Sequence, residues 1–323
     1  MKKVLLLFGG NSLEHEVSCN SAKSILKNYD KTKFIFIPVF IDKNNNWFIY
    51  TGDIDSITNI DKSNLIQIDN IIEYLKKYDL VFSIIHGFGG EDGKLQGMLD
   101  LFNIKYVGSN SLVSAIGMDK EISKILFTYL GIPVTPYMVV ENLKNIQEIE
   151  RFFNYPIIIK PCNGGSSIGL SKANNRKELK EGIIKALKYD NKVLIEKYIK
   201  GRELECAVLE HKKLIISDIG EILKDTELYD YESKYVKKID TTIPTDIPKN
   251  IKRQIQDYSK KVFEFLKCKD LARIDFFYDE ESNKIYLNEI NTLPGFTEIS
   301  MYPKLIMNKK ISYKDLITYL IQK

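Results

Sequence analysis

Acidic side chains inside two apolar runs near the carboxyl end constrain the fold of this chain more than any other feature. The runs, LARIDFFY and KIYLNEI, flank the polar turn 279–283 and predict a β-hairpin. Strand side chains alternate between two faces, so Arg273 and Asp275 share one face of their strand, as do Glu289 and Asn291 of theirs. If the hairpin turns about Ser282, Asp275 lies opposite Glu289 and Arg273 opposite Asn291, all on the same side.

Two carboxylates that face each other across a hairpin repel, at a cost of roughly 0.2–1 kcal/mol. A divalent cation removes that cost, and Asp, Glu and Asn supply the hard oxygen ligands that suit Mg²⁺. The alternative is a surface hairpin with solvated charges. The apolar setting of the acidic residues, and the Pro294-Gly295 turn that follows, favour the magnesium site.

The amino-terminal part has the pattern of an α/β domain. Val4–Phe8 is a continuous apolar run, which is typical of a strand buried in a parallel sheet. Gly-Gly-Asn-Ser follows, and then a helix is predicted over 14–28, with Val17, Ala22 and Ile25 on its apolar face. A strand, a glycine turn and a helix can bind an anion, although this pattern alone is weak.

A second glycine-rich loop, HGFGGEDGKLQG at 86–97, follows the predicted strand 80–85. Open α/β sheets bind their ligands at the carboxyl ends of the strands, so this loop is a candidate ligand site. His86 at its start is either a ligand contact or a packed, hydrogen-bonded core histidine.

One long helix is predicted over 114–130, with Met118, Ile122, Ile125, Leu126 and Tyr129 on its apolar face. Gly131 and Pro133 end it. A domain boundary near residue 110 precedes this helix.

The loop CNGGSS at 162–167, called here the phosphate loop, lies between two predicted strands. Because no helix follows it, it differs from the nucleotide loop of the G-x-x-x-x-G-K-[ST] type. With Lys160 at its base and two serines, it reads as a hairpin that covers phosphates; a plain tight turn is the alternative. The segment 226–246 has few aliphatic residues and is predicted to be a functional loop.

Composition narrows the function classes. The 47 basic and 43 acidic residues give a net charge of +4 without a basic tract, so nothing favours nucleic-acid binding. No run approaches the roughly 18 apolar residues of a membrane helix. The 4 cysteines match no zinc or redox spacing, which indicates reduced thiols of a cytoplasmic protein.

Taken together, the motifs resemble the D-alanine-D-alanine ligases of the ATP-grasp fold. The resemblance covers nearly the whole chain, and the motifs stand in the family's order: GGNSLEHEVS, HGFGGEDGKLQG, MDK, IIIKPCNGGSSIG, LIEKYIKGRE, YDYESKY, ARID and NEINTLPGFT. It implies an open parallel α/β domain over 1–109 and two ATP-grasp subdomains over 110–198 and 199–323, with a lid at 226–236.

The resemblance also implies a nucleotide site that holds ATP with Mg²⁺ or Mn²⁺, as two ions. Residues that match the family's ATP contacts are Lys120, Lys160, Glu196, Lys197, Ile199, Glu203 and Lys234. Those that match its metal ligands are Asp275, Glu289 and Asn291. Glu196 corresponds to the adenine contact, Glu203 to the ribose contact, and the lysines to phosphate contacts.

The implied reaction joins two D-alanine molecules through an acyl phosphate, to give D-alanyl-D-alanine for peptidoglycan synthesis. Residues that match the family's catalytic set are Glu14, Ser166, Tyr235, Arg273 and Gly295, and those that match substrate contacts are His86, Val17, Ser300 and Met301. Arg273 and the Gly295 amide would form an oxyanion hole.

Three departures from the family bear on substrate choice and loop chemistry. Met301 stands where Leu is usual, Asn163-Gly164 replaces a charged residue, and Phe88 replaces a polar one. A D-alanine-D-serine ligase remains an alternative, as does another ATP-grasp carboxylate-amine ligase; Tyr235 argues against D-lactate. The resemblance suggests a homodimer.

Overall fold

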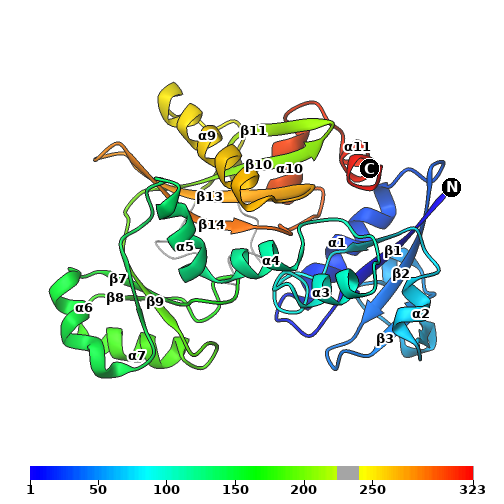
Figure 1. Ribbon diagram of the computed structural model, residues 1–323, viewed down its shortest axis with the longest axis horizontal. Coiled ribbons are helices and arrows are strands. Elements are labelled where there is room, and N and C mark those ends of the chain that lie inside the picture. Colours follow the sequence, from blue (N-terminus) through cyan, green and yellow to red (C-terminus); the bar gives the residue numbers. More distant parts are fainter. Residues whose placement is uncertain (224–239, 323) are drawn as a thin grey trace.

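Three β-sheets organise the chain, and the computed structural model in Figure 1 describes residues 1–223 and 240–322. The first sheet has the order β4-β3-β2-β1-β5, the second β6-β9-β7-β8 and the third β12-β11-β10-β13-β14. The first lies at the right of the view, the second at the lower left and the third across the top.

The first sheet is mixed, whereas the sequence predicted an open parallel sheet. β1 pairs in parallel with β2 and β5, but β3 and β4 are antiparallel to their neighbours; the short turn 42–46 joins β2 to β3, and the longer segment 51–64 joins β3 to β4. Its strands and flanking helices are β1 (Lys2–Gly9), α1 (His15–Asn28), β2 (Phe34–Ile41), β3 (Trp47–Tyr50), β4 (Leu65–Gln67), α2 (Ile71–Leu75), β5 (Leu80–Ser83) and α3 (Lys94–Leu101).

The second sheet is antiparallel and carries α6 and α7 on one side (Figure 1). Ile159, Leu179 and Ile183 are fully buried between this sheet and α7. The elements are β6 (Tyr137–Val140), α6 (Ile146–Phe152), β7 (Ile157–Pro161), β8 (Ser171–Ala173), α7 (Arg176–Ala186) and β9 (Val193–Lys197).

The third sheet is antiparallel, with α9 packed on one face and α10 on part of the other. Alternate residues of β10 point oppositely, so Leu204 and Val208 pack under α9, while Leu209 packs towards α10. The elements are β10 (Arg202–His211), β11 (Lys213–Ile222), β12 (Thr241–Thr242), α9 (Lys249–Leu266), β13 (Leu271–Asp279), β14 (Lys284–Asn291), α10 (Met301–Met307) and α11 (Tyr313–Ile321). β12 lies inside the stretch predicted to be wholly loop.

The two ends of the chain share one hydrophobic core. Val4 and Phe8 of β1 belong to the same buried cluster as Leu316 and Leu320 of α11. The Lys2 ammonium donates to the Ile321 carbonyl at 2.8 Å, and both termini lie at the same end of the molecule in Figure 1.

The helix predicted over 114–130 is two helices, α4 (Ser111–Met118) and α5 (Lys120–Tyr129), which meet at Asp119. Asp119 is extended (φ −88°, ψ 103°), and its carboxylate caps α5 by accepting from the Glu121 and Ile122 amides at 3.0 and 3.2 Å. An aspartate that satisfies free amides favours such a start, which a periodicity argument over the whole stretch overlooks.

The predicted apolar face of α5 was also wrong. Ile122, Ile125 and Tyr129 are 40%, 49% and 78% exposed, whereas Lys120 and Lys124 face inward. The inward lysines lie one turn apart, beside the carboxylates described below.

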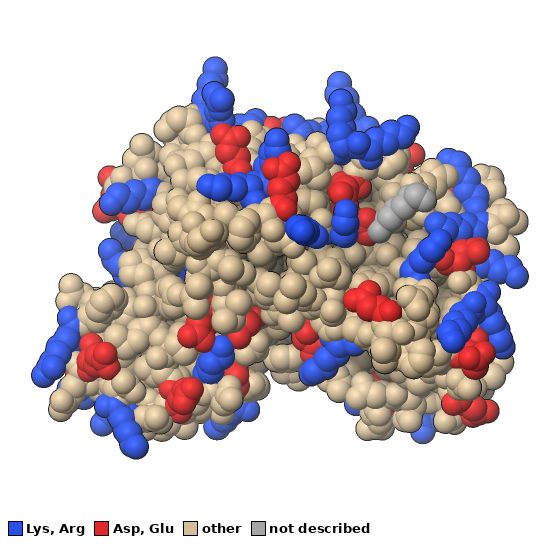
Figure 2. Space-filling view, viewed as in Figure 1, with Lys and Arg blue, Asp and Glu red and all other residues tan. Residues whose placement is uncertain are grey.

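Charged side chains of both signs are interspersed over the face in Figure 2, which is hollowed between the two lower lobes. Among the described residues, no helix is long and apolar enough to cross a membrane.

Candidate active site

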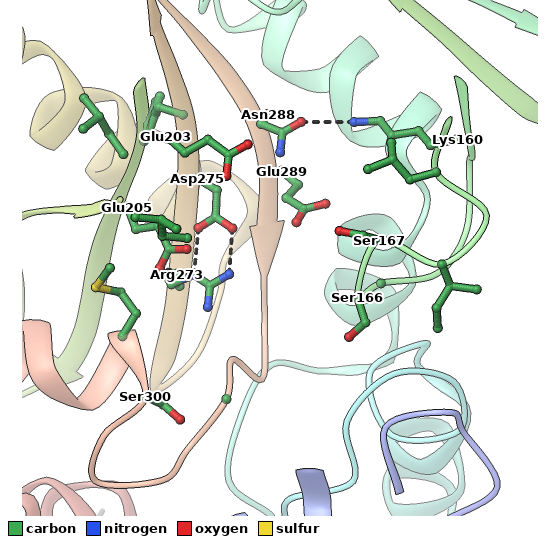
Figure 3. A pocket seen from close by; sticks show the side chains of 18 of the residues that line it. Lys160, Ser166, Ser167, Glu203, Glu205, Arg273, Asp275, Asn288, Glu289 and Ser300 are labelled. Carbon is green, nitrogen blue, oxygen red and sulfur yellow. Dashed lines mark hydrogen bonds and ion pairs between the residues drawn. The ribbon is translucent and has the colours of Figure 1, made fainter. Parts of the chain in front are cut away.

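A cavity of about 1410 Å³ lies between the second and third sheets and extends to α1 of the amino-terminal domain. Its walls are the phosphate loop on one side and the β13–β14 hairpin on the other, facing each other across open space in Figure 3. Val17 lines it from α1, which explains why this side chain is only partly buried although it was assigned to the apolar face of that helix.

The hairpin has the predicted register. Asp275 pairs with Glu289, and Arg273 pairs with Asn291. The register then shifts between Asp275 and Phe276, so that Asn288 is an extra residue on β14. This β-bulge was not predicted. It lets both Glu289 and its neighbour Asn288 line the cavity.

Three carboxylates form a lateral row across the third sheet. Glu205 of β10 and Glu289 of β14 are the two neighbours of Asp275 on β13. Arg273 supplies a counter-charge: its Nε lies 2.9 Å from Glu205, and its guanidinium donates to both Asp275 oxygens at 2.8 and 2.7 Å. Burial works against the charged form, but Asp275 and Glu205 raise the pKa of Arg273 well above its usual value.

Sequence reasoning missed Glu205, which is 4% exposed. Its signal was present, because it lies two residues after Glu203 and therefore on the same face of an otherwise apolar strand.

Three lysines and a glutamate line or adjoin the opposite wall. The Lys160 ammonium lies 2.8 Å from Glu196 Oε2 and donates to Asn288 Oδ1 at 3.2 Å. Lys124 lies 2.7 Å from the other Glu196 oxygen. Lys120 lies 3.7 Å from Glu289 and donates to the Gly164 carbonyl of the phosphate loop. The contacts of Lys160 with Asn288 and of Lys120 with Glu289 therefore connect the two walls of the cavity.

These charges shift one another's pKa. Burial raises the pKa of Glu196, but the ammonium groups of Lys124 and Lys160 lower it to about 2, so this carboxylate is ionised. Burial lowers the pKa of Lys160, but Glu196 and Glu289 raise it above its usual value.

The phosphate loop is held to α1 by one side chain. Ser166 donates to the buried carboxylate of Glu14, across 152 residues of sequence. Ser166 and Ser167 both adopt the left-handed conformation, with φ of 52° and 57°. Gly164 has φ 112°, and a Cβ there would lie 3.5 Å from the Phe88 ring, so the loop also packs against the 86–97 segment.

His86 is buried behind the cavity, as in the core-histidine alternative. Its Nε2 lies 3.0 Å from Ser21 Oγ and its Nδ1 3.1 Å from the Leu293 carbonyl. Burial lowers its pKa. Near it, burial and the charge of Glu14 raise the pKa of Glu91 to about 8, and Glu91 accepts from the Gly87 amide at 2.8 Å.

Most of the predicted site residues meet in this one cavity. Those that line it are Val17, Lys120, Lys160, Ser166, Glu196, Lys197, Ile199, Glu203, Arg273, Asp275, Glu289, Gly295, Ser300 and Met301. Glu14, His86 and Asn291 stand behind its wall: Glu14 contacts Ser166, and Asn291 donates to Asp275 at 2.9 Å. Lys234, Tyr235 and all the rest of the predicted lid, 226–236, lie outside the described residues.

The donor set at the hairpin suits a hard cation. Asp275 and Glu289 both line the cavity, and their oxygens, together with the Asn291 amide, are of the kind that Mg²⁺ takes when phosphates complete its coordination. A row of three carboxylates with one guanidinium also leaves negative charge for a cation to neutralise.

Comparisons with known proteins agree with this architecture. Residues 3–109 match the family model described as D-ala D-ala ligase N-terminus, and residues 126–322 match D-ala D-ala ligase C-terminus. A D-alanine–D-alanine ligase of Acetivibrio thermocellus is 44% identical over 99% of this chain and 95% of its own length. One of Caldicellulosiruptor bescii is 43% identical over 99% and 94%.

Solved structures are similar over the same length. The VanG D-Ala:D-Ser ligase of Enterococcus faecalis has a TM-score of 0.88 at 35% identity, covering 99% of this chain and 98% of its own. The D-alanine-D-alanine ligase of Coxiella burnetii has a TM-score of 0.87 at 30% identity, covering 99% and 93%. That of Bacillus anthracis, complexed with ATP, has a TM-score of 0.77 at 27% identity, covering 100% and 97%. With both family models matched and full-length relatives above 40% identity, this chain belongs to the D-alanine–D-alanine ligase family.

Proposed function

We propose that this protein is an ATP-dependent ligase that joins two D-alanine molecules. The observation that carries the proposal is the single cavity that receives the hairpin carboxylates, Arg273 and two lysines on opposite walls, with Ser166 tying Glu14 to its edge. A carboxylate activated by phosphate needs positive charge around the phosphoryl group and around the developing oxyanion. Lys120 and Lys160 supply the positive charge for the phosphoryl group, and Arg273 supplies it for the oxyanion.

The nucleotide lies between the second and third sheets. The base lies in the part of the cavity next to Glu196; Ile158, Leu170, Ile199 and Leu204 are apolar residues among those that line the cavity. The ribose lies near Glu203, and the phosphates lie between the phosphate loop and the hairpin, within reach of Lys120 and Lys160. Lys234 of the predicted lid is a further phosphate ligand on the sequence resemblance.

Asp275, Glu289 and Asn291 would hold two Mg²⁺ or Mn²⁺ ions beside the phosphates. When bound, such ions neutralise charge that develops on the transferred phosphoryl group, a contribution of several kcal/mol. Lys120, 3.7 Å from Glu289, adds positive charge from the other wall.

In the first step, a carboxylate oxygen of one D-alanine attacks the terminal phosphorus of ATP, and ADP leaves. Glu14 receives the ammonium of this D-alanine, with Val17 and His86 completing the pocket. Arg273 and the Gly295 amide face the carboxylate, so they stabilise the oxyanion of the second step.

In the second step, the amine of the other D-alanine attacks the acyl carbon. The tetrahedral oxyanion collapses, phosphate leaves, and the amine proton goes to solvent or to the departing phosphate. Ser300 and Met301 contact the second substrate, and Tyr235 of the lid would link this pocket to Ser166. The dipeptide serves peptidoglycan synthesis in the cytoplasm, and we infer a homodimer.

D-serine is the competing second substrate, because one solved structure that this chain resembles is a D-Ala:D-Ser ligase at 35% identity. The curated relatives at 40–44% identity carry the D-alanine–D-alanine name, which favours D-alanine. The chemistry is the same for both, and only the pocket around Ser300 and Met301 discriminates between them.

The test supplies ATP, Mg²⁺ and an equimolar mixture of D-alanine, D-serine and D-lactate, and identifies products by mass spectrometry. We expect D-alanyl-D-alanine to dominate, no product from L-alanine, and no turnover with EDTA. Arg273→Lys should lose most activity, whereas Arg253→Lys, at an exposed position of α9, should not. Equal turnover of L-alanine would reject the assignment; a dominant D-alanyl-D-serine product would move it to the alternative.

A further inference from the structure

Lys124 is a fully buried lysine that the reaction, as described, does not use. Its side chain is 0% exposed, and it is absent from the cavity wall. It lies one helical turn after Lys120 on the inward face of α5, while the apolar Ile122 and Ile125 of the same helix are exposed. Helices usually bury isoleucine and expose lysine, so the reverse arrangement on α5 indicates that a buried positive charge is needed at this position.

The buried charge is directed at one carboxylate. Lys124 Nζ lies 2.7 Å from Glu196 Oε1, and Lys160 Nζ lies 2.8 Å from Glu196 Oε2. Among the described residues, Glu196 is the carboxylate in ion-pair contact with Lys124, and the ammonium also lies 5.7 Å from the centre of the Tyr137 ring. Glu196 is therefore held between two cations, one from behind the cavity wall and one from inside it.

One lysine would be enough to neutralise the Glu196 carboxylate, so the presence of a second lysine needs its own explanation. Lys160 also lines the cavity and reaches across it to Asn288 at 3.2 Å (Figure 3). If Lys160 alone balanced Glu196, its movement towards a phosphate would leave a buried carboxylate without a counter-ion, which is strongly unfavourable. With Lys124 in place, Glu196 remains paired when Lys160 turns away.

The two cations also fix the hydrogen-bonding character of Glu196. An ionised carboxylate only accepts hydrogen bonds, and its two oxygens offer about four acceptor positions, while each Glu196 oxygen has one ammonium group in ion-pair contact. Because Glu196 lines the cavity, its remaining acceptor positions suit a base that presents a donor. Adenine carries an exocyclic amine, which donates, whereas hypoxanthine carries at the same ring carbon a carbonyl, which only accepts.

We infer that Lys124 is a positioning residue, which holds Glu196 as an ionised acceptor for the nucleobase and thereby frees Lys160 for the phosphates. The inference rests on the proposed function, because it takes ATP as the ligand of this cavity. It assigns Lys124 no contact with the nucleotide.

The test compares Lys124→Met with Lys124→Arg, measuring kcat and KM for ATP, for inosine triphosphate and for D-alanine. In Lys124→Met, KM for ATP should rise roughly tenfold or more, the worth of one hydrogen bond to a charged group. The preference for ATP over inosine triphosphate should fall by a similar factor, while KM for D-alanine stays at the wild-type value. Lys124→Arg should recover most of both properties.

A double-mutant cycle with Glu196→Gln separates this role from a structural one. If Lys124 acts only through Glu196, the Lys124→Met/Glu196→Gln variant should have the same KM for ATP as Glu196→Gln alone. Glu196→Gln and the double variant both remove the carboxylate partner of Lys160, so the comparison between them isolates Lys124, and Lys124→Arg keeps the inference testable if Lys124→Met does not fold.

Unchanged KM for ATP and unchanged base preference in Lys124→Met would overturn the inference. So would a further rise of KM in the double variant, or a rise of KM for D-alanine equal to that for ATP. A wild-type protein that does not couple ATP to D-alanine would instead refute the proposed function, and that outcome is seen before any variant is measured.

Discussion

Replacing Ser166 tests whether the bond between the phosphate loop and α1 controls the reaction. The Ser166 hydroxyl donates to Glu14, whose carboxylate is buried, and Ser166 itself has a left-handed backbone (φ 52°). Ser166→Ala and Ser166→Gly both remove the hydroxyl, but only glycine adopts this conformation without a steric penalty. Comparison of the two variants therefore separates the effect of the Ser166–Glu14 hydrogen bond from the effect of the backbone conformation.

The hydrogen bond and the backbone conformation contribute different amounts to the free energy of unfolding. A hydrogen bond to a charged group contributes about 1.5–3 kcal/mol, and its loss leaves the buried Glu14 carboxylate without this donor. Both variants lose that amount in free energy of unfolding. The left-handed conformation costs a residue with a Cβ about 1–2 kcal/mol, so Ser166→Gly should be about 1 kcal/mol more stable than Ser166→Ala after the entropy cost of glycine.

Urea unfolding measures the stability, and steady-state kinetics measure kcat/KM for D-alanine. If the bond aligns Glu14, kcat/KM should fall about 10- to 100-fold in both variants, independently of their difference in stability. Ser167 is the matched control: its φ is 57°, so the glycine–alanine difference in stability should recur there without the loss of the Glu14 bond. A Ser166→Ala variant with wild-type stability and kcat/KM would refute the reasoning.

Three further predictions follow from the same structure. Glu289→Gln should reduce ADP release by orders of magnitude without lowering the melting temperature, since it removes a metal ligand and also the repulsion with Asp275; near-normal turnover would exclude the hairpin from catalysis. Gly220→Ala would place a Cβ 2.9 Å from Met301 Sδ, so urea unfolding should show a loss of about 1–3 kcal/mol, and an unchanged midpoint would contradict the packing. Burial raises the pKa of Glu91 to about 8, so the folded state binds a proton that the unfolded state releases, and the free energy of unfolding should fall as pH rises towards 8. In Glu91→Gln this fall should be smaller than in the wild type. Identical curves of melting temperature against pH for the two proteins would disprove the role of Glu91.

The hairpin could be predicted residue by residue, because the rule behind it is local. Alternation in a strand has an invariant period, so a polar turn and two apolar runs determine which side chains oppose each other. Asp275 and Glu289 are opposite as expected. The bulge at Asn288 could not be foreseen, since strict alternation along a strand has no place for an extra residue.

α5 shows where the same reasoning fails. Hydrophobic periodicity assumes that the apolar stripe faces the interior, and Ile122 and Ile125 form such a stripe. Here the interior is a charged cavity wall, so the lysine stripe faces inward instead. Lys124 was missed for this reason. Both Lys124 and Glu205 are buried against a charge from a distant part of the chain, and although the spacing from Glu203 marks the face of Glu205, the strand alone does not identify its partner.

The core shared by the first strand and the last helix has a consequence for how the chain folds during synthesis. Val4 and Phe8 emerge from the ribosome long before Leu316 and Leu320, which cover the same core. The amino-terminal sheet must therefore wait, with part of one face uncovered, until α11 has been synthesised. Contacts so distant in sequence form slowly, and apolar surface left open in the meantime favours aggregation. Removal of α11 alone should thus impair the folding of a domain that begins about 300 residues earlier.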